Sequence, residues 1–492
     1  MNKRKIKSNK GVTLIFLIIV LILILIATRI LVDIVYTDNN HRVYFNVPAS
    51  WDDVYAYITD QNGTELNGVW PGEPMACEQD YIYSVNLTNL PLNAEVVINF
   101  NNGNPPEHNF SEGKQYSVTT NYQGNNKIYN LISGIGGYTE SPGEWIDYSK
   151  NISFGKIPTT KQEIKNVIYM IGDGMGENHI KAGALYKGET LNVQTIPNTS
   201  YVKTASINTV TDSAAGATAL FAGKKAVNYT VGLDKYGNDT ENLMEFSKNS
   251  LGMKVGFACT ELLCHATPAS FSVHNVYRYN YDEIVLDQIN SGIDVMLGGG
   301  RTNFAPYQSE MIQNNFVWVN NFADLENVNK NQKVIGTFAE GTIGLGLEAN
   351  RTSLADLTEE SLERLENDDG FVLMVEGSDI DVACHNVEMD KMLVEMIDFD
   401  DAIGVAMKYV DEHPDTLLVI TADHETGGID MNGVVNKEQL TNDLFKNPGG
   451  HTETDVLVYA YGNGAEDLTQ YDVIDNTSIF KFIKQGLENC YK

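Results

Sequence analysis

Short apolar runs that alternate with helical segments limit the possible folds of this chain more than any other feature. The runs are Val167–Ile171, Lys254–Ala258, Asp294–Leu297, Phe371–Val375, Thr416–Ile420 and Val456–Tyr461. Strands that are apolar throughout are buried on both faces, which is typical of a largely parallel sheet flanked by helices. The pattern predicts an α/β domain over residues 166–492.

Acids and histidines follow these runs at the point where each strand should end. Asp173 follows the first run, Glu376 follows Phe371–Val375, and Asp423 and His424 follow Thr416–Ile420. In α/β sheets, functional residues gather beyond the carboxyl ends of the strands. One such residue would be an ordinary cap or turn acid, but the repeated combination of carboxylates with histidine indicates metal ligation.

The densest cluster of acids runs from Glu376 to His385. Asp381 and His385 are four residues apart, so on a helix they share a face and can chelate one ion. Carboxylates with neutral imidazoles suit Zn²⁺, whereas a site of carboxylate and hydroxyl oxygens suits Mg²⁺.

With these strand-end motifs, the segments Thr211–Thr218 (TDSAAGAT) and Thr267–Arg278 carry a resemblance to the alkaline phosphatase family, over roughly residues 166–490. The resemblance implies a metal-dependent hydrolase of phosphate monoesters with Ser213 as nucleophile and Arg278 as the phosphate clamp. It also implies two Zn²⁺ and one Mg²⁺. The implied ligands are Asp381, His385 and His451 for the first zinc; Asp173, Asp423 and His424 for the second; and Glu376 and Thr267 for magnesium.

Elementary chemistry agrees with these implied roles. A serine hydroxyl is a poor nucleophile near neutral pH, and a neighbouring Zn²⁺ favours its ionised form. Ser213 opens an alanine-rich segment, which predicts a helix whose first amides face the phosphate. Arg278 supplies a planar fork for two phosphate oxygens.

Two positions depart from the family pattern: His265, and Val382, which stands where a polar residue often reaches the phosphate. His265 stands where an aspartate commonly organises the water around magnesium, which leaves the identity of the third ion open. Sulfatases of the same superfamily need a Pro- and Arg-containing context that Ser213–Gly216 lacks. The third-ion pair and Arg278 also favour monoesters over diesters.

The N-terminus predicts an anchor. Lys3, Arg4, Lys5, Lys7 and Lys10 precede an apolar run over residues 11–27, which resumes at Ile30. Spanning a membrane takes roughly 20 apolar residues, and the basic side stays cytoplasmic. We therefore expect residues 1–36 to form a cytoplasmic tail and single transmembrane helix, with the catalytic domain extracellular. A cleaved signal peptide and a pilin-like processing site remain alternatives, and both also export the chain.

Residues 38–122 are expected to form a small all-β sandwich, and 123–165 a linker rich in Asn, Gly, Ser and Pro. Tyr55 and Tyr57 alternate with apolar residues, and Asn62–Gly63 is a turn signal. The segment is similar to small starch-binding modules of bacterial amylases. That resemblance implies a platform of Tyr55, Tyr57 and Trp70 for α-glucan, although aromatic residues are also common in half-buried strands.

A formal net charge of −31 excludes a nucleic-acid-binding role, because phosphate backbones attract Lys and Arg. Five cysteines match no disulfide or zinc-finger spacing, so buried thiols are expected. Family members are often dimers, which raises a homodimer as an expectation. The alternative function is a surface starch- or glycan-binding protein with weak or altered, phosphodiesterase-type activity.

Overall fold

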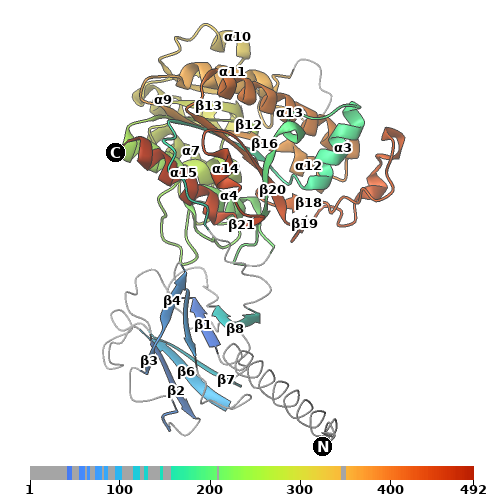
Figure 1. Ribbon diagram of the computed structural model, residues 1–492. Helices are drawn as coiled ribbons and strands as arrows, with labels where there is room; N and C mark the ends of the chain where they lie inside the picture. The colour runs from blue at the N-terminus through green and yellow to red at the C-terminus, as the bar shows by residue number, and fades with distance from the viewer. Residues whose placement is uncertain are drawn as a thin grey trace, which may run out of the picture. The chain divides into compact units, whose positions relative to one another are not determined.

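We analysed a computed structural model of the chain (Figure 1). It divides into two compact units, residues 1–152 and 153–492. In the second unit, residues 157–207, 210–344 and 351–491 are described. In the first, the described segments are 42–46, 55–60, 64–66, 72–79, 82–86, 95–101, 115–121, 127–130 and 144–147.

A ten-stranded sheet forms the centre of the second unit, in the order β14-β15-β13-β12-β16-β10-β17-β20-β11-β21. Its first seven strands pair in parallel, β20 is antiparallel to both neighbours, and β21 is parallel to β11. The strands are β10 (Asn166–Gly172), β11 (Asn198–Lys203), β12 (Lys254–Leu262), β13 (Val295–Gly299), β14 (Phe316–Val319), β15 (Lys333–Thr337), β16 (Phe371–Gly377), β17 (Thr416–Thr421), β20 (Val456–Gly462) and β21 (Val473–Asp475). The predicted α/β fold with a largely parallel sheet is confirmed.

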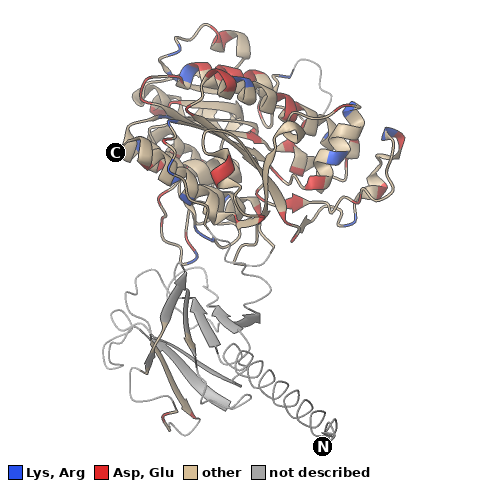
Figure 2. Ribbon diagram, in the orientation of Figure 1, with Lys and Arg blue, Asp and Glu red and all other residues tan. Residues whose placement is uncertain are grey.

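Helices cover both faces of this sheet (Figure 1). In one group of helices, α13 (Met389–Glu412) contacts the three others, which are α3 (Glu177–Lys187), α11 (Leu354–Leu365) and α12 (Asp379–His385). The other includes α4 (Ser213–Ala222), α6 (Ala266–Ser272) and α15 (Thr477–Cys490). Figure 2 shows acidic residues along helices such as α11 and α13, which fits a solvated, soluble surface. Cys259, Cys264 and Cys384 are free and buried, as expected.

The register of the central strands positions the site. Ile171 of β10 pairs with Glu376 of β16 on one side and with Thr421 of β17 on the other. The residues that follow these three parallel strands therefore meet at one edge of the sheet. A few residues after β17, β18 (Glu425–Thr426) pairs with β19 (His451–Thr452) in a two-stranded ribbon. This pairing brings residue 451 back to residue 426.

All elements described in the first unit are strands. One sheet has the order β4-β5-β1-β8-β9 and the other β3-β2-β6-β7. The strands are β1 (Arg42–Asn46), β2 (Tyr55–Asp60), β3 (Glu73–Pro74), β4 (Ala76–Gln79), β5 (Ile82–Asn86), β6 (Glu95–Asn101), β7 (Gln115–Asn121), β8 (Lys127–Asn130) and β9 (Glu144–Asp147).

Strands β8 and β9 fall inside the stretch that the sequence predicted to be a linker. The β8 strand pairs in parallel with β1, and β9 pairs with β8, so both join the sheet that β1 begins. Each of these strands is only four residues long and is flanked by Asn, Gly and Ser, so its few apolar residues gave no strand pattern in the sequence. The predicted anchor, residues 1–36, lies outside the described residues, and no described helix has the length and apolarity to span a membrane.

Candidate metal centre

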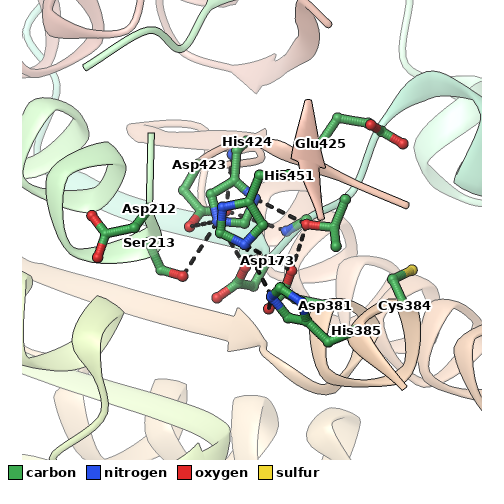
Figure 3. Close-up of polar contacts among 12 residues, drawn as sticks. Asp173, Asp212, Ser213, Asp381, Cys384, His385, Asp423, His424, Glu425 and His451 are labelled. Atoms are coloured by element: carbon green, nitrogen blue, oxygen red, sulfur yellow. Dashed lines mark hydrogen bonds and ion pairs between the residues drawn. The ribbon is translucent and has the colours of Figure 1, made fainter. Parts of the chain in front are cut away.

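Two clusters of ligand-type side chains meet at the carboxyl edge of the sheet (Figure 3). Asp381, His385 and His451 offer atoms within 4.8 Å of one another, and so do Asp173, Asp423 and His424. The clusters are adjacent, because the rings of His424 and His451 stack with centroids 3.6 Å apart. The structure therefore brings together all six residues that the sequence suggested as zinc ligands.

The first cluster has the hydrogen bonding of a cation site. The Nδ1 atoms of His385 and His451 lie 2.8 Å from the carbonyl oxygens of Gly449 and Thr211. A carbonyl only accepts, so both Nδ1 atoms donate, and the two Nε2 atoms face each other 3.0 Å apart. Asp381 lies 3.2 Å from His385 Nε2 and 3.6 Å from His451 Nε2. A proton or a cation placed among the two Nε2 atoms and the Asp381 carboxylate would interact favourably with all of these acceptors.

The electrostatics of the first cluster favour a charged carboxylate. Burial opposes ionisation of Asp381, but its hydrogen bond with His385 and the charges of the neighbouring histidines hold its pKa below its usual range. The same hydrogen bond raises the pKa of His385. A cation bound at this cluster would therefore compete with a proton on His385.

The second cluster is fully buried. His424 Nε2 lies 3.1 Å from Asp423 Oδ2 and 3.6 Å from Asp173 Oδ1. Burial raises the pKa of Asp423 to about 7. Burial also raises the pKa of Asp173 well above its usual range, with further contributions from the charges of Asp423, Asp381 and Glu376. Several buried acids this close need protons or cations to compensate them.

Glu376 and Thr267 have unsatisfied polar atoms. Both carboxylate oxygens of Glu376 and the hydroxyl of Thr267 are buried and make no hydrogen bond of ordinary geometry with the described residues, although Ser378 and Thr267 lie close enough to the carboxylate to oppose the rise of its pKa. Burial raises the pKa of Glu376 to about 8. They lie outside the two ligand clusters, Glu376 at the end of β16 and Thr267 in α6, and these two elements pack together. Oxygens left without partners in this way suit a hard cation such as Mg²⁺.

Ser213 begins α4 beside the second cluster. Its Oγ lies 3.3 Å from His424 Nε2, and Figure 3 shows the hydroxyl directed toward that ring. Asp212 caps the helix by accepting from the amide of Ala215. Gly216 lets α4 lie close to the backbone of Asp423, because a Cβ at this position would lie only 2.9 Å from the carbonyl oxygen of Asp423.

Arg278 reaches the same place from the segment after α6. Its Nη1 donates to Asp212 Oδ2 at 2.9 Å, and its Nη2 lies 3.2 Å from His265 Nε2. Its Nε is buried without a hydrogen-bond partner in the described part of the chain, so one donor is available. Arg278 thus connects His265 with Asp212, the residue that precedes the nucleophile candidate.

The family model for alkaline phosphatase matches residues 164–448, which is more than half of the chain. The chain belongs to the alkaline phosphatase family. Alkaline phosphatases 4 and 3 of Bacillus subtilis (strain 168) are each 37% identical to it, over 301 and 303 residues that cover 56% of this chain. The alignments span 65% and 64% of those two relatives, which is just under two thirds of their length.

Solved structures of the family share the fold. The alkaline phosphatase from the Antarctic bacterium TAB5 matches with a TM-score of 0.61 and 31% identity, covering 68% of this chain and 99% of that one. A variant of that enzyme with a histidine replaced by aspartate, solved with Mg bound in its M3 site, matches with a TM-score of 0.60 and 30% identity. A second family model, starch-binding module 26, matches residues 43–109.

Sequence reasoning missed two residues of this alkaline phosphatase site. Asp212 holds Arg278, and its position before an alanine-rich helix was the available signal. Thr426 Oγ1 lies 2.5 Å from Asp381 Oδ1 and 3.1 Å from His424 Nδ1. The signal for Thr426 was its place two residues after His424, on the same side of an extended segment.

The predicted glycan platform is only partly described. Ala56 and Ile58 of β2 are buried, while Tyr55 and Tyr57 on the other side of the strand are half-buried. The Tyr57 hydroxyl donates to Glu65 at 3.1 Å. Trp70 lies outside the described residues.

Proposed function

We propose that this protein hydrolyses phosphate monoesters through a phosphoserine at Ser213. The observation that carries the proposal is the serine hydroxyl 3.3 Å from His424 Nε2, at the start of a helix and beside two adjacent ligand clusters. Membership of the alkaline phosphatase family supports the same reaction. The alignment spans just under two thirds of the length of the Bacillus relatives, so the activity of the whole protein is itself part of the proposal.

The residues divide the work by chemical type. Asp381, His385 and His451 would hold one Zn²⁺, Asp173, Asp423 and His424 a second, and Glu376 and Thr267 a Mg²⁺. Bound there, the cations would lower the pKa of the attacking hydroxyl and offset charge on the phosphoryl oxygens. Arg278 binds the other phosphoryl oxygens, and Asp212 holds its guanidinium in place.

The reaction then proceeds in two displacements. Ser213 Oγ bonds to phosphorus as the ester P–O bond breaks, and the leaving oxygen departs as an alcohol with a proton. Water next attacks the phosphoserine, which releases inorganic phosphate and restores the serine. The first amides of α4 add partial positive charge toward the phosphate throughout.

Hydrolysis of p-nitrophenyl phosphate with and without a chelator tests the proposal. The chelator should abolish turnover of the parent, and added Zn²⁺ should restore it. Ser213→Ala removes the covalent route but no ligand, so we expect a loss of roughly 1,000-fold or more in kcat with unchanged metal content. Asp423→Ala should lose metal and activity together. A fully active Ser213→Ala variant would refute the assignment.

A second candidate function is binding of α-glucan by the first unit, and it is favoured by the match of residues 43–109 to starch-binding module 26. Sugar faces stack on flat aromatic rings, and the strand pattern leaves Tyr55 and Tyr57 away from the buried side of β2. We place Trp70 in the same platform by resemblance. A glycan-binding protein with a silent or altered catalytic domain is the competing interpretation, and the assay above separates the two.

The proposed location is the outer side of a cell membrane. Residues 1–36 would anchor the chain by one helix, and residues 38–122, 123–165 and 166–492 would follow as module, linker and catalytic domain. If so, intact cells should hydrolyse a membrane-impermeant phosphate ester, and removal of residues 1–36 should release the activity into the soluble fraction. Activity found only after lysis would contradict this location. A homodimer is the proposed oligomeric state, which sedimentation of the soluble form tests.

A further inference from the structure

Exposed tyrosines gather beside Arg278. Tyr277 and Tyr279 are each 47% exposed, and their ring centroids are 5.2 Å apart at an interplanar angle of 72°. The guanidinium carbon of Arg278 lies 5.4 Å from the centre of the Tyr279 ring. The aromatic surface therefore starts at the phosphate-clamp candidate and extends toward solvent.

A second loop, which carries the exposed Tyr229, is joined to the Arg278 segment through its backbone. The amide of Tyr229 donates to Asp212 Oδ2 at 3.1 Å, and its carbonyl accepts from the amide of Arg278 at 2.9 Å. With a φ of 71°, Tyr229 holds a backbone conformation that is costly for a bulky residue, and such outliers cluster at functional sites. Its side chain is 51% exposed.

This exposure of large apolar groups is concentrated rather than scattered. Nine large hydrophobic side chains are exposed in the described part of the chain, and four of them belong to these two loops: Tyr229, Val276, Tyr277 and Tyr279. A local concentration of exposed apolar side chains marks a binding surface more often than a single exposed residue does.

The position of the surface indicates which part of a substrate it contacts. Asp212 precedes Ser213 and pairs with Arg278, so the phosphoryl group lies on the inner side of the guanidinium in the proposed reaction. The alcohol part of the ester must then extend outward, toward the tyrosines. Exposed ring faces favour a leaving group with a flat C–H face that can stack on them.

We propose that Tyr277 and Tyr279 bind the sugar ring of a phosphorylated glucosyl residue, either glucose phosphate or phosphate esterified to α-glucan. The C–H face of a pyranose suits these rings, and the same chain matches a starch-binding module. This inference rests on the proposed phosphatase function. The ester P–O bond breaks as described above, and the sugar leaves with its hydroxyl oxygen and a proton.

The test compares kcat/KM for glucose 6-phosphate with kcat/KM for methyl phosphate, whose leaving group has no ring to stack. In the double variant Tyr277→Ala/Tyr279→Ala, we expect the ratio of the two values to fall roughly 10-fold, mainly through KM for the sugar ester. The double variant Tyr277→Phe/Tyr279→Phe keeps the rings and should keep the ratio. Tyr186→Ala, an exposed tyrosine of α3, is the matched control and should change neither value.

The possible outcomes are distinguishable. An unchanged ratio in the alanine variant, or equal losses on both substrates, would overturn the sugar-binding role while leaving the phosphatase intact. A loss confined to p-nitrophenyl phosphate would assign the surface to aryl esters and also overturn it. A parent protein inactive on methyl phosphate and on p-nitrophenyl phosphate would overturn the proposed function, and this inference with it. Metal content measured in each variant excludes damage to the ligand clusters.

Discussion

Thr426 joins the two ligand clusters through a single hydroxyl. His424 Nδ1 donates to Thr426 Oγ1, and the threonine hydroxyl in turn donates to Asp381. The first bond leaves the lone pair of His424 on Nε2, which faces Asp173, Asp423 and Ser213. The turn after β10 also packs against Thr426. Gly174 in this turn has a φ of 71°, and a Cβ there would lie only 2.8 Å from Thr426 Oγ1, so the position favours glycine.

Replacing Thr426 by valine should weaken metal binding at both clusters. Valine keeps the shape of threonine but makes neither hydrogen bond, and loss of such partners typically costs about 10- to 100-fold in metal affinity. The measurement is zinc retained after dialysis against buffers of fixed free zinc. Thr426→Ser should recover most of the affinity. Parent-like retention by the valine variant would show that the hydroxyl has no positioning role.

His265 offers a second test at the residue scale. Burial, together with the charge of Arg278, lowers its pKa to about 3, so the ring is neutral, and its Nδ1 is buried without a hydrogen-bond partner among the described residues. A carboxylate there would provide the oxygen ligand or water acceptor that Mg²⁺ prefers. We expect His265→Asp to increase activation by added Mg²⁺, while His265→Asn should not. Identical Mg²⁺ titration curves for the parent and the aspartate variant would contradict this.

At the scale of elements, the central strands were predictable and the outer ones were not. Runs such as Val167–Ile171 and Phe371–Val375 became β10 and β16, because strands buried on both faces must be apolar throughout. Strand β11 carries exposed Thr199 and Tyr201, so it lacks that signal, and its pairing with β20 joins residues more than 250 positions apart. Long-range pairing of this kind leaves no local mark in a sequence.

The candidate site was predictable to the same extent. Ligand types placed after buried strands identify the edge of the sheet where they meet, which is why Asp173 and Asp423 could be chosen from sequence. Asp212 could be singled out as a helix cap, but its pairing with Arg278, 66 residues away, could not be predicted, because that contact exists only in the folded chain.

Glu261, near the end of strand β12, gives a prediction at this scale. Burial raises its pKa from 4.5 to about 7. Between these values the folded chain holds a proton that the unfolded chain has lost, so this group makes stability fall as the pH rises from about 5 to about 7. Glu261→Gln cannot ionise. We expect it to be more stable than the parent at pH 8, on the order of 1–3 kcal/mol, with little difference at pH 5.

Urea unfolding at the two pH values, at a fixed free-zinc concentration, measures this difference. Glu326→Gln, which removes an exposed carboxylate, is the control for the loss of one negative charge. An advantage for Glu261→Gln that is equal at pH 5 and pH 8 would mean that its charge is not the cause.

At the scale of the whole molecule, one acidic chain joins a catalytic domain of the alkaline phosphatase family to a segment similar to starch-binding module 26. A net charge of −31 opposes binding to phosphate-rich polymers, but it does not oppose neutral α-glucan. Tethering would raise the local concentration of phosphate esters attached to the same glucan. In the proposed function, the module would thereby act on encounter with substrate rather than on the bond-breaking step.

The last prediction tests this separation of roles with the chain from residue 38 to 492. The parent should be retarded in a native gel that contains soluble starch, and Tyr57→Ala should migrate faster there, because the stacking ring is lost while the buried side of β2 is kept. Trp70→Ala should behave in the same way. Hydrolysis of methyl phosphate should stay at the parent level in both variants, and Tyr186→Ala should be retarded like the parent. A parent that migrates identically with and without starch, glycogen and maltooligosaccharides would reduce the module to a spacer.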